Sequence, residues 1–227
     1  MLRVWLADRP GSLASVAGRI GAGGGDVVGI DVLERGAGRV IDEFVVELPG
    51  PSALDDVVAG VRELEGVDVE LAHLVPALLD PRLDALELAA ALVTQTNADD
   101  LLDTLCEESR LRFSCSWAAV VNRATAGTLA SSGPAPHARW LSAFVTGVSA
   151  GNGDGPLDVA WAPLGDTSLV LVLGRDQTRI RDRERRQIGA LAVIAAARFL
   201  QTSLAGSPDR RSASVCDHPS WGDRQPG

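Results

Sequence analysis

The fold is indicated first by residues 2–25, which read LRVWLADRPGSLASVAGRIGAGGG. Residues 2–7 alternate between the two sides of an extended chain, which predicts a β-strand. After the turn at residues 8–13, apolar side chains recur at the spacing of one helical face: Leu13, Val16, Ala17 and Ile20. The glycines of residues 21–25 end this helix, because glycine accepts the left-handed conformation common at helix ends.

The pattern continues to Pro76. Strands are expected over residues 26–34 and 39–48, then a helix that Ser52 can cap, then a strand over residues 67–74. The resulting order, strand-helix-strand-strand-helix-strand, predicts a ferredoxin-like sandwich with two helices on one face of a four-stranded sheet. The second face and an edge of such a sheet stay uncovered, which favours a homodimer.

The second half of the chain predicts a separate α+β domain. A linker over residues 76–82 leads to this domain at residues 83–204, and residues 205–227 are expected to form a disordered tail. The first helix, residues 83–96, should turn one apolar stripe inward: Leu83, Leu86, Ala90 and Val93. Further elements are a helix capped by Asn97, strands at 115–121 and 126–131, a helix within 134–150, strands at 157–162 and 168–173, and a closing helix from about residue 181.

The residues most suggestive of a binding site form the turn Asp8-Arg-Pro-Gly-Ser-Leu13. Gly11 has no side chain, so a ligand can approach the backbone closely there. The first N–H groups of the following helix are unpaired and lie at the positive end of the helix dipole, where they can receive a carboxylate. Asp8 can pair with an ammonium group. The turn could therefore bind the two ends of a free amino acid, or it could serve only to shape the backbone.

Residues 1–74 resemble an ACT domain. The resemblance rests on the D-x-P-G-x-L motif at residues 8–13, the glycine-rich helix exit, and the sequence Gly29-Ile30-Asp31 in the second strand. ACT domains are regulatory modules that typically bind amino acids between the first loop of one subunit and strand residues of another, although many only associate. The resemblance implies a loop half of the site formed by Asp8, Pro10, Gly11, Ser12 and Leu13. It implies a strand half formed by Gly29, Ile30 and Asp31.

The C-terminal half resembles a GAF domain less closely. The similarity lies in the helix before Cys115, the strands at 157–162 and 168–173, and the final strand and helix. GAF domains bind cyclic nucleotides, chromophores, haem or small metabolites, or only dimerise. Because residues 122–125 do not carry the N-K-x-D pattern of cyclic-nucleotide-binding GAF domains, we expect a dimerising domain without a ligand.

The charge and composition of the chain disfavour several classes of function. The formal net charge of −9 over 227 residues disfavours nucleic-acid binding, and the dense arginine stretch at residues 179–186 reads as a solvated first helical turn. The absence of lysine, with many alanines, glycines and valines, suggests an actinobacterial source. No apolar run reaches the roughly 20 residues of a membrane helix, and no secretory signal is evident, so a cytoplasmic location without membrane contact is expected.

Catalytic and metal-binding patterns are not evident in the sequence. The three cysteines form no C-x-x-C pair, and His73, His137 and His218 lie in different elements. No nucleophile elbow, phosphate-binding loop or dinucleotide fingerprint is present. The sequence therefore predicts a protein that is not an enzyme and has no cofactor or metal: a regulatory sensor of an amino acid or similar effector. The alternative is a ligand-free dimerisation module that docks onto a metabolic enzyme or regulator.

Overall fold

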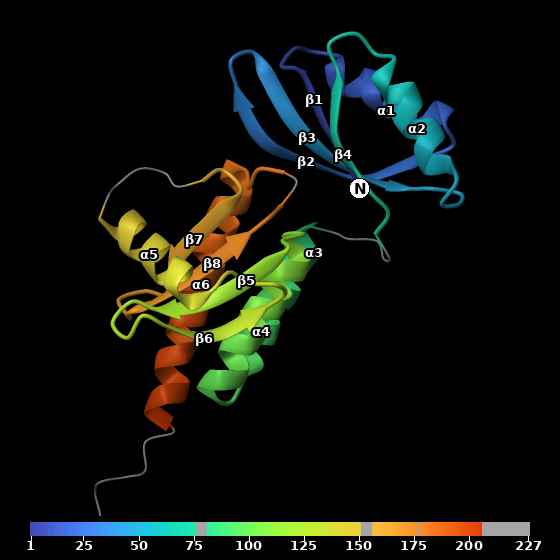
Figure 1. Ribbon diagram of the computed structural model, residues 1–227. Helices are drawn as coiled ribbons and strands as arrows, with labels where there is room; N and C mark the ends of the chain where they lie inside the picture. Colours follow the sequence, from blue (N-terminus) through green and yellow to red (C-terminus); the bar gives the residue numbers. More distant parts are fainter. Residues whose placement is uncertain (76–80, 151–155, 177, 206–227) are drawn as a thin grey trace, which may run out of the picture.

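The chain forms two units that lie side by side in the computed structural model, which describes residues 1–75, 81–150, 156–176 and 178–205 (Figure 1). Each unit has one four-stranded antiparallel sheet. The predicted mixed α+β class is confirmed. We call the part from β1 to β4 the N-terminal unit and the part from α3 to α6 the C-terminal unit.

The N-terminal unit follows the element order predicted from its sequence. Its elements are β1 (Leu2–Ala7), α1 (Ser12–Ala22), β2 (Asp26–Gly36), β3 (Arg39–Glu47), α2 (Ala53–Arg62) and β4 (Asp68–Ala72). The sheet order is β2-β3-β1-β4, so the central strands β3 and β1 are neighbours although α1 and β2 separate them in sequence. Ser52 does precede α2, but its side chain makes no capping hydrogen bond, so that part of the prediction was wrong.

The core of the N-terminal unit lies between the sheet and helices α1 and α2. It contains Val16 and Ile20 from the predicted stripe of α1, and Val40 and Phe44 from β3. Leu13 of that stripe is 39% exposed, so its expected burial was wrong. The glycines after α1 let the chain pass close to this core: a Cβ atom at Gly23 would lie 2.7 Å from Val57 Cγ2. The glycine-rich exit is therefore required by packing as well as by helix termination.

The C-terminal unit has helices on both faces of its sheet. Its elements are α3 (Pro81–Thr94), α4 (Ala98–Arg112), β5 (Trp117–Asn122), β6 (Gly127–Ser132), α5 (Ala138–Ser149), β7 (Val159–Pro163), β8 (Leu169–Gly174) and α6 (Asp182–Ala205), and the sheet order is β6-β5-β8-β7. Ala118 and Val120 of β5 pack with α3, α4 and α6, whereas Ala119 and Val121 pack with α5. Asn97 caps α4 as predicted, because its side chain accepts a hydrogen bond from the Asp100 N–H (2.8 Å).

Helix α3 differs from the sequence prediction in its start and its orientation. It begins at Pro81, inside the expected linker, and α6 continues through Ala205, the first residue of the expected tail; residues 206–227 lie outside the described part. The stripe expected to face inward is instead exposed, with Leu83 at 53%, Leu86 at 68% and Val93 at 50%. Leu88 and Leu92 face the core. Because α3 is apolar on nearly all sides, periodicity alone could not choose the buried face.

The sheet face that α1 and α2 leave open is covered by the C-terminal unit. Arg3, Leu33, Ile41 and Val45 of this face are all buried, and the first turns of α6 pack against β2 (Figure 1). The expectation of an uncovered face was therefore wrong for the chain as a whole. Because this face is covered, it gives no physical reason to place a homodimer interface there. That the protein forms a homodimer stays a prediction.

Candidate functional site

A cavity of about 480 Å³ opens where β1 leads into α1. It is lined by five of the eight residues predicted to bind a ligand: Asp8, Pro10, Gly11, Leu13 and Ile30. Leu6, Ala7, Arg9, Val32, Arg35, Val40 and Asp42 complete the lining. We call this the α1 cavity. The structure thus brings the motif loop and one residue of the predicted strand half together within a single chain.

Gly11 gives the loop the geometry of an open helix N-terminus. Its φ of +92° and ψ of −19° place it in the left-handed region, where residues with a Cβ atom are strained. No side chain caps α1, and its first turn contains no acidic residue. A Cβ atom at Gly11 would meet nothing within 4 Å. The Ser12 N–H donates to the Arg9 carbonyl, but the N-cap residue of α1 supplies no side-chain cap to the other N–H groups at this positive end.

Asp42 is the most unusual residue in the cavity lining. It is only 2% exposed, and its Oδ1 atom is buried without a hydrogen-bond partner among the described residues. Burial raises its pKa above the ordinary value; the charge of Arg35 opposes this rise and that of Asp8 adds to it. A buried carboxyl oxygen without a hydrogen-bond partner is destabilising.

The sequence analysis overlooked Asp42, although a signal for it was present. The apolar face of β3 was read from Val40, Phe44 and Val46, and residue 42 occupies the same face between them. A charged residue at a core-facing position of a strand is rare unless it is paired. That exception to the apolar pattern of β3 could have drawn attention to Asp42.

The other three predicted ligand residues lie elsewhere. Ser12 does not line the cavity, and its N–H donates to the Arg9 carbonyl (3.3 Å). Gly29 lies opposite Val45 in the sheet. Asp31 is on the opposite face of β2 from Ile30, where its Oδ1 pairs with Arg183 Nη1 of α6 (2.6 Å). Within one chain, therefore, the structure does not bring Asp31 to the motif loop.

Besides the pair of Asp31 and Arg183, an ion-pair network joins the two units. Arg3 of β1 donates to Glu43 of β3 and, through Nη2, to Glu184 Oε1 of α6 (2.8 Å). Arg175, which follows β8, also donates to Glu184 (2.7 Å). Both arginines and Glu184 are at least 94% buried. Because the charged groups meet directly, the network fixes how the units dock.

A second group of contacts lies beside the first. Arg181 donates to Glu34 of β2 (3.2 Å) and to Glu70 of β4. Its guanidinium lies over the Trp5 ring, 5.0 Å from the centroid. Arg181 is only 3% exposed, so the reading of residues 179–186 as a solvated helical turn was wrong. Local charge density could not show that the acidic partners lie more than 100 residues away in sequence.

Glu184 is held in its charged form by this network. Burial alone would raise its pKa, but the charges of Arg175 and Arg3 outweigh burial, and hydrogen bonds from Arg175 and the Arg181 N–H add to them, so the pKa lies below its ordinary value. The carboxylate contributes to docking while it is ionised.

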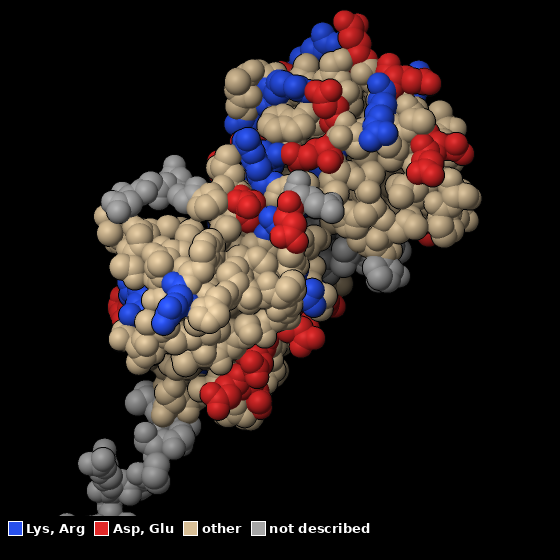
Figure 2. Space-filling model, in the orientation of Figure 1, with Lys and Arg blue, Asp and Glu red and all other residues tan. Residues whose placement is uncertain are grey.

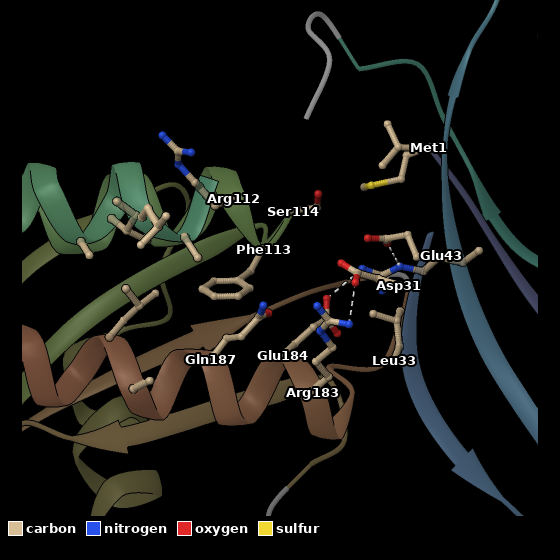
Figure 3. Close-up of a pocket in the computed structure, with 18 of the residues that line it drawn as sticks. Met1, Asp31, Leu33, Glu43, Arg112, Phe113, Ser114, Arg183, Glu184 and Gln187 are labelled. Atoms are coloured by element: carbon tan, nitrogen blue, oxygen red, sulfur yellow. Dashed lines mark hydrogen bonds and ion pairs between the residues drawn. The ribbon is translucent and has the colours of Figure 1, made fainter. Parts of the chain in front are cut away.

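A second cavity, of about 260 Å³, lies between the units, beside the network. Figure 3 shows Met1, Leu33 and Glu43 of the N-terminal unit facing Phe113, Gln187 and Glu184 of the C-terminal unit across it. We call this the inter-unit cavity. Nothing in the sequence analysis predicted it.

The remaining chemical groups show no assembled reactive centre within the described residues. Cys106 and Cys115 are free and buried, and burial raises the pKa of these thiols to about 12 and about 11 respectively. His137 caps α5 by accepting from the Arg139 N–H (3.2 Å). The described part of the chain holds no group of three or more His, Cys, Asp or Glu residues that could hold a metal ion. Within the same residues, no helix combines the length and apolar character needed to cross a membrane.

The charges on the surface are mixed in sign. Figure 2 shows acidic and basic side chains interspersed over the N-terminal unit, whereas the C-terminal unit presents mainly uncharged residues on the face shown.

Comparison with known proteins gives a match among solved structures but none among families or curated sequences. No family model and no curated protein matches this sequence. Among solved structures, the chain is similar to the GAF domain of the Acinetobacter phosphoenolpyruvate-protein phosphotransferase, with 11% sequence identity and a TM-score of 0.43. The match covers 58% of this chain and 99% of that one. Membership of the ACT family stays a prediction from the sequence.

Proposed function

We propose that this chain is a non-catalytic regulatory protein that binds a free amino acid, or a similar small effector bearing an amine, in the α1 cavity. The observation that carries the proposal is the buried Oδ1 atom of Asp42, which has no hydrogen-bond partner among the described residues and lies in a cavity that Asp8 also lines. An ammonium group placed there would supply the missing donor and could pair with the carboxyl groups of both Asp8 and Asp42. Hydrogen bonds between charged groups are the strong ones in proteins.

The opposite end of an amino acid fits the start of α1. The N–H groups of the first turn carry partial positive charge, and Gly11 leaves room for a carboxylate beside them. Leu13, Ile30 and Val32 provide an apolar wall for a side chain. Leu13 is 39% exposed and Ile30 is 40% exposed, so binding would also remove apolar surface from water.

The strand β2 offers a route by which binding could be sensed in the C-terminal unit. Ile30 lines the α1 cavity, and the next residue, Asp31, pairs with Arg183 of α6. Glu34 on the same strand pairs with Arg181. A ligand that shifts β2 would therefore act directly on the contacts that dock α6.

A thermal-shift screen against the twenty amino acids tests this proposal. A ligand at 100 times its dissociation constant stabilises the native state by about 2.7 kcal/mol. For a chain of this size that is about 5–10 °C. Leu13→Trp should abolish the shift by filling the cavity. Leu129→Trp is the matched control, because Leu129 is 51% exposed on β6 and does not line the cavity.

No stabilisation by any of the twenty would contradict the proposal and favour the second candidate, a ligand-free interaction module that docks onto a metabolic enzyme or regulator. One observation supports that candidate: the exposed stripe of Leu83, Leu86 and Val93 along α3. Exposed apolar stripes mark association surfaces when they are continuous. Sedimentation of the wild type and of Leu86→Glu would test it, because a complex or dimer formed through α3 should dissociate in the variant.

A further inference from the structure

We propose that the inter-unit cavity is a second ligand site, which takes an uncharged, largely apolar small molecule carrying one hydrogen-bond acceptor. Its volume of about 260 Å³ lies just below the range of about 300–1,000 Å³ typical of ligand pockets, so the ligand is small. This proposal is independent of amino-acid binding in the α1 cavity.

The apolar character follows from the walls of the cavity. The N-terminal sheet contributes Leu33 and Val45, and the C-terminal unit contributes Phe113, Leu191 and Ile194. Ala85 and Ala89 of α3 close one side with small side chains, which leaves space that larger residues would occupy. Such walls favour a hydrocarbon body.

We infer that the ligand carries a hydrogen-bond acceptor from the state of the Arg3 side chain. This residue lines the cavity, its side chain is 3% exposed, and its Nη1 atom is buried without a hydrogen-bond partner among the described residues. Its other donors, Nε and Nη2, are used by Glu43 and Glu184. One donor nitrogen of a buried guanidinium, Nη1 with its two N–H groups, is therefore left for a ligand oxygen, and an unpartnered donor nitrogen in such a place is costly.

We infer that the ligand is uncharged from the charged groups that surround Arg3. Glu43 and Glu184 already lie against its guanidinium, and Arg175 shares Glu184. These two arginines and two glutamates balance. A ligand carboxylate would bring a third negative charge to Arg3, at a cost that burial increases. Asp31 and Arg183 also line the cavity, and they pair with each other (Figure 3). A carbonyl or ether oxygen meets the donor without that repulsion.

The test uses three ligands of one shape: cyclohexyl methyl ketone, cyclohexanecarboxylate and 1-cyclohexylethylammonium. Met1 is the one methionine of the sequence and lines the cavity, so its ¹³C-labelled methyl group gives a single NMR signal that reports occupancy. The ketone should shift this signal saturably. A hydrogen bond to a charged donor contributes about 1.5–3 kcal/mol, so the ketone should bind at least about tenfold more tightly than the ammonium compound, which offers no acceptor.

Two variants of α3 separate occupancy of the cavity from surface effects. Ala89→Phe fills the cavity and should remove the response to the ketone. Ala90→Phe adds the same side chain at an exposed position that does not line the cavity, and it should leave the response intact. The proposal is overturned if the ketone leaves the Met1 signal unchanged, if the two variants respond alike, or if the carboxylate or the ammonium compound binds as tightly as the ketone.

Discussion

Replacing Asp42 with Asn should make the unliganded protein more stable at neutral pH. The wild-type carboxyl group is 2% exposed, and one of its oxygens has no partner in the described structure. An unsatisfied buried polar group costs about 1–3 kcal/mol, and more when it is charged. Asn keeps the size of the side chain and removes the charge but leaves a polar group, so we expect a gain of about 1 kcal/mol in the free energy of unfolding. For a chain of this length the melting temperature should rise by about 2–4 °C.

The stabilisation by Asp42→Asn should grow as the pH rises, whereas a change in packing alone would stabilise the protein equally at every pH. Burial raises the pKa of Asp42 above its ordinary value of 3.8, so the native state binds this proton more tightly than the unfolded state. Stability from this group is therefore full below pH 3.8 and is lost as the pH rises through the native pKa. The advantage of Asp42→Asn should be small at pH 3.5 and largest at pH 7.5.

Urea unfolding of the wild type and the variant at several pH values, followed by circular dichroism, measures this effect. Asp26→Asn is the control, because Asp26 is exposed at the start of β2; its effect should stay within about 0.5 kcal/mol. A variant less stable than the wild type at pH 7.5, or one whose advantage does not grow with pH, would refute the reasoning that Asp42 is a buried carboxylate held for a ligand.

Three further predictions concern the rest of the molecule. Glu184→Gln should lower the free energy of unfolding by about 3 kcal/mol, because it leaves buried arginines uncompensated. Since the pKa of Glu184 lies below its ordinary value of 4.5, the wild type should lose this stabilisation only as the pH falls below about 4.5, which thermal melts between pH 3 and 6 would show. Gly133→Ala should destabilise the C-terminal unit by about 2–3 kcal/mol in urea unfolding, since its φ is +76° and a Cβ atom there would lie 2.3 Å from a backbone oxygen just before β5. In a Cys216→Ser background, the thiols of Cys106 and Cys115 should react with a disulfide reagent only after unfolding, because burial raises the pKa of both to about 11–12.

Much of the N-terminal unit could be predicted because its signals are local. Alternation at residues 2–7, the stripe of Val16 and Ile20, and the glycines after α1 each involve neighbouring residues, and each corresponds to an observed element. The turn at residues 8–13 was likewise recognisable from its spacing, and five of its residues line one cavity.

The contacts between units could not be predicted in the same way. Arg3 and Glu184 are separated by 181 positions, so no window of sequence contains both. The stretch at residues 179–186 read as a solvated turn because the acidic partners of Arg181 and Arg183 belong to another unit. For α3, apolar residues on nearly all sides left its orientation undetermined, and packing against α4 and α6 decided it.

The central claim is that the α1 cavity binds both charged ends of an amino acid. Calorimetric titration tests it most directly, with the amino acid that gives the largest thermal shift compared with its N-acetyl derivative and its carboxamide. The first derivative removes the ammonium group offered to Asp8 and Asp42, and the second removes the carboxylate offered to α1. We predict binding of the free amino acid at one site per chain, with each derivative at least about tenfold weaker, since each loses a charged hydrogen bond. Equal affinity for either derivative, or no heat with any amino acid, would contradict the account.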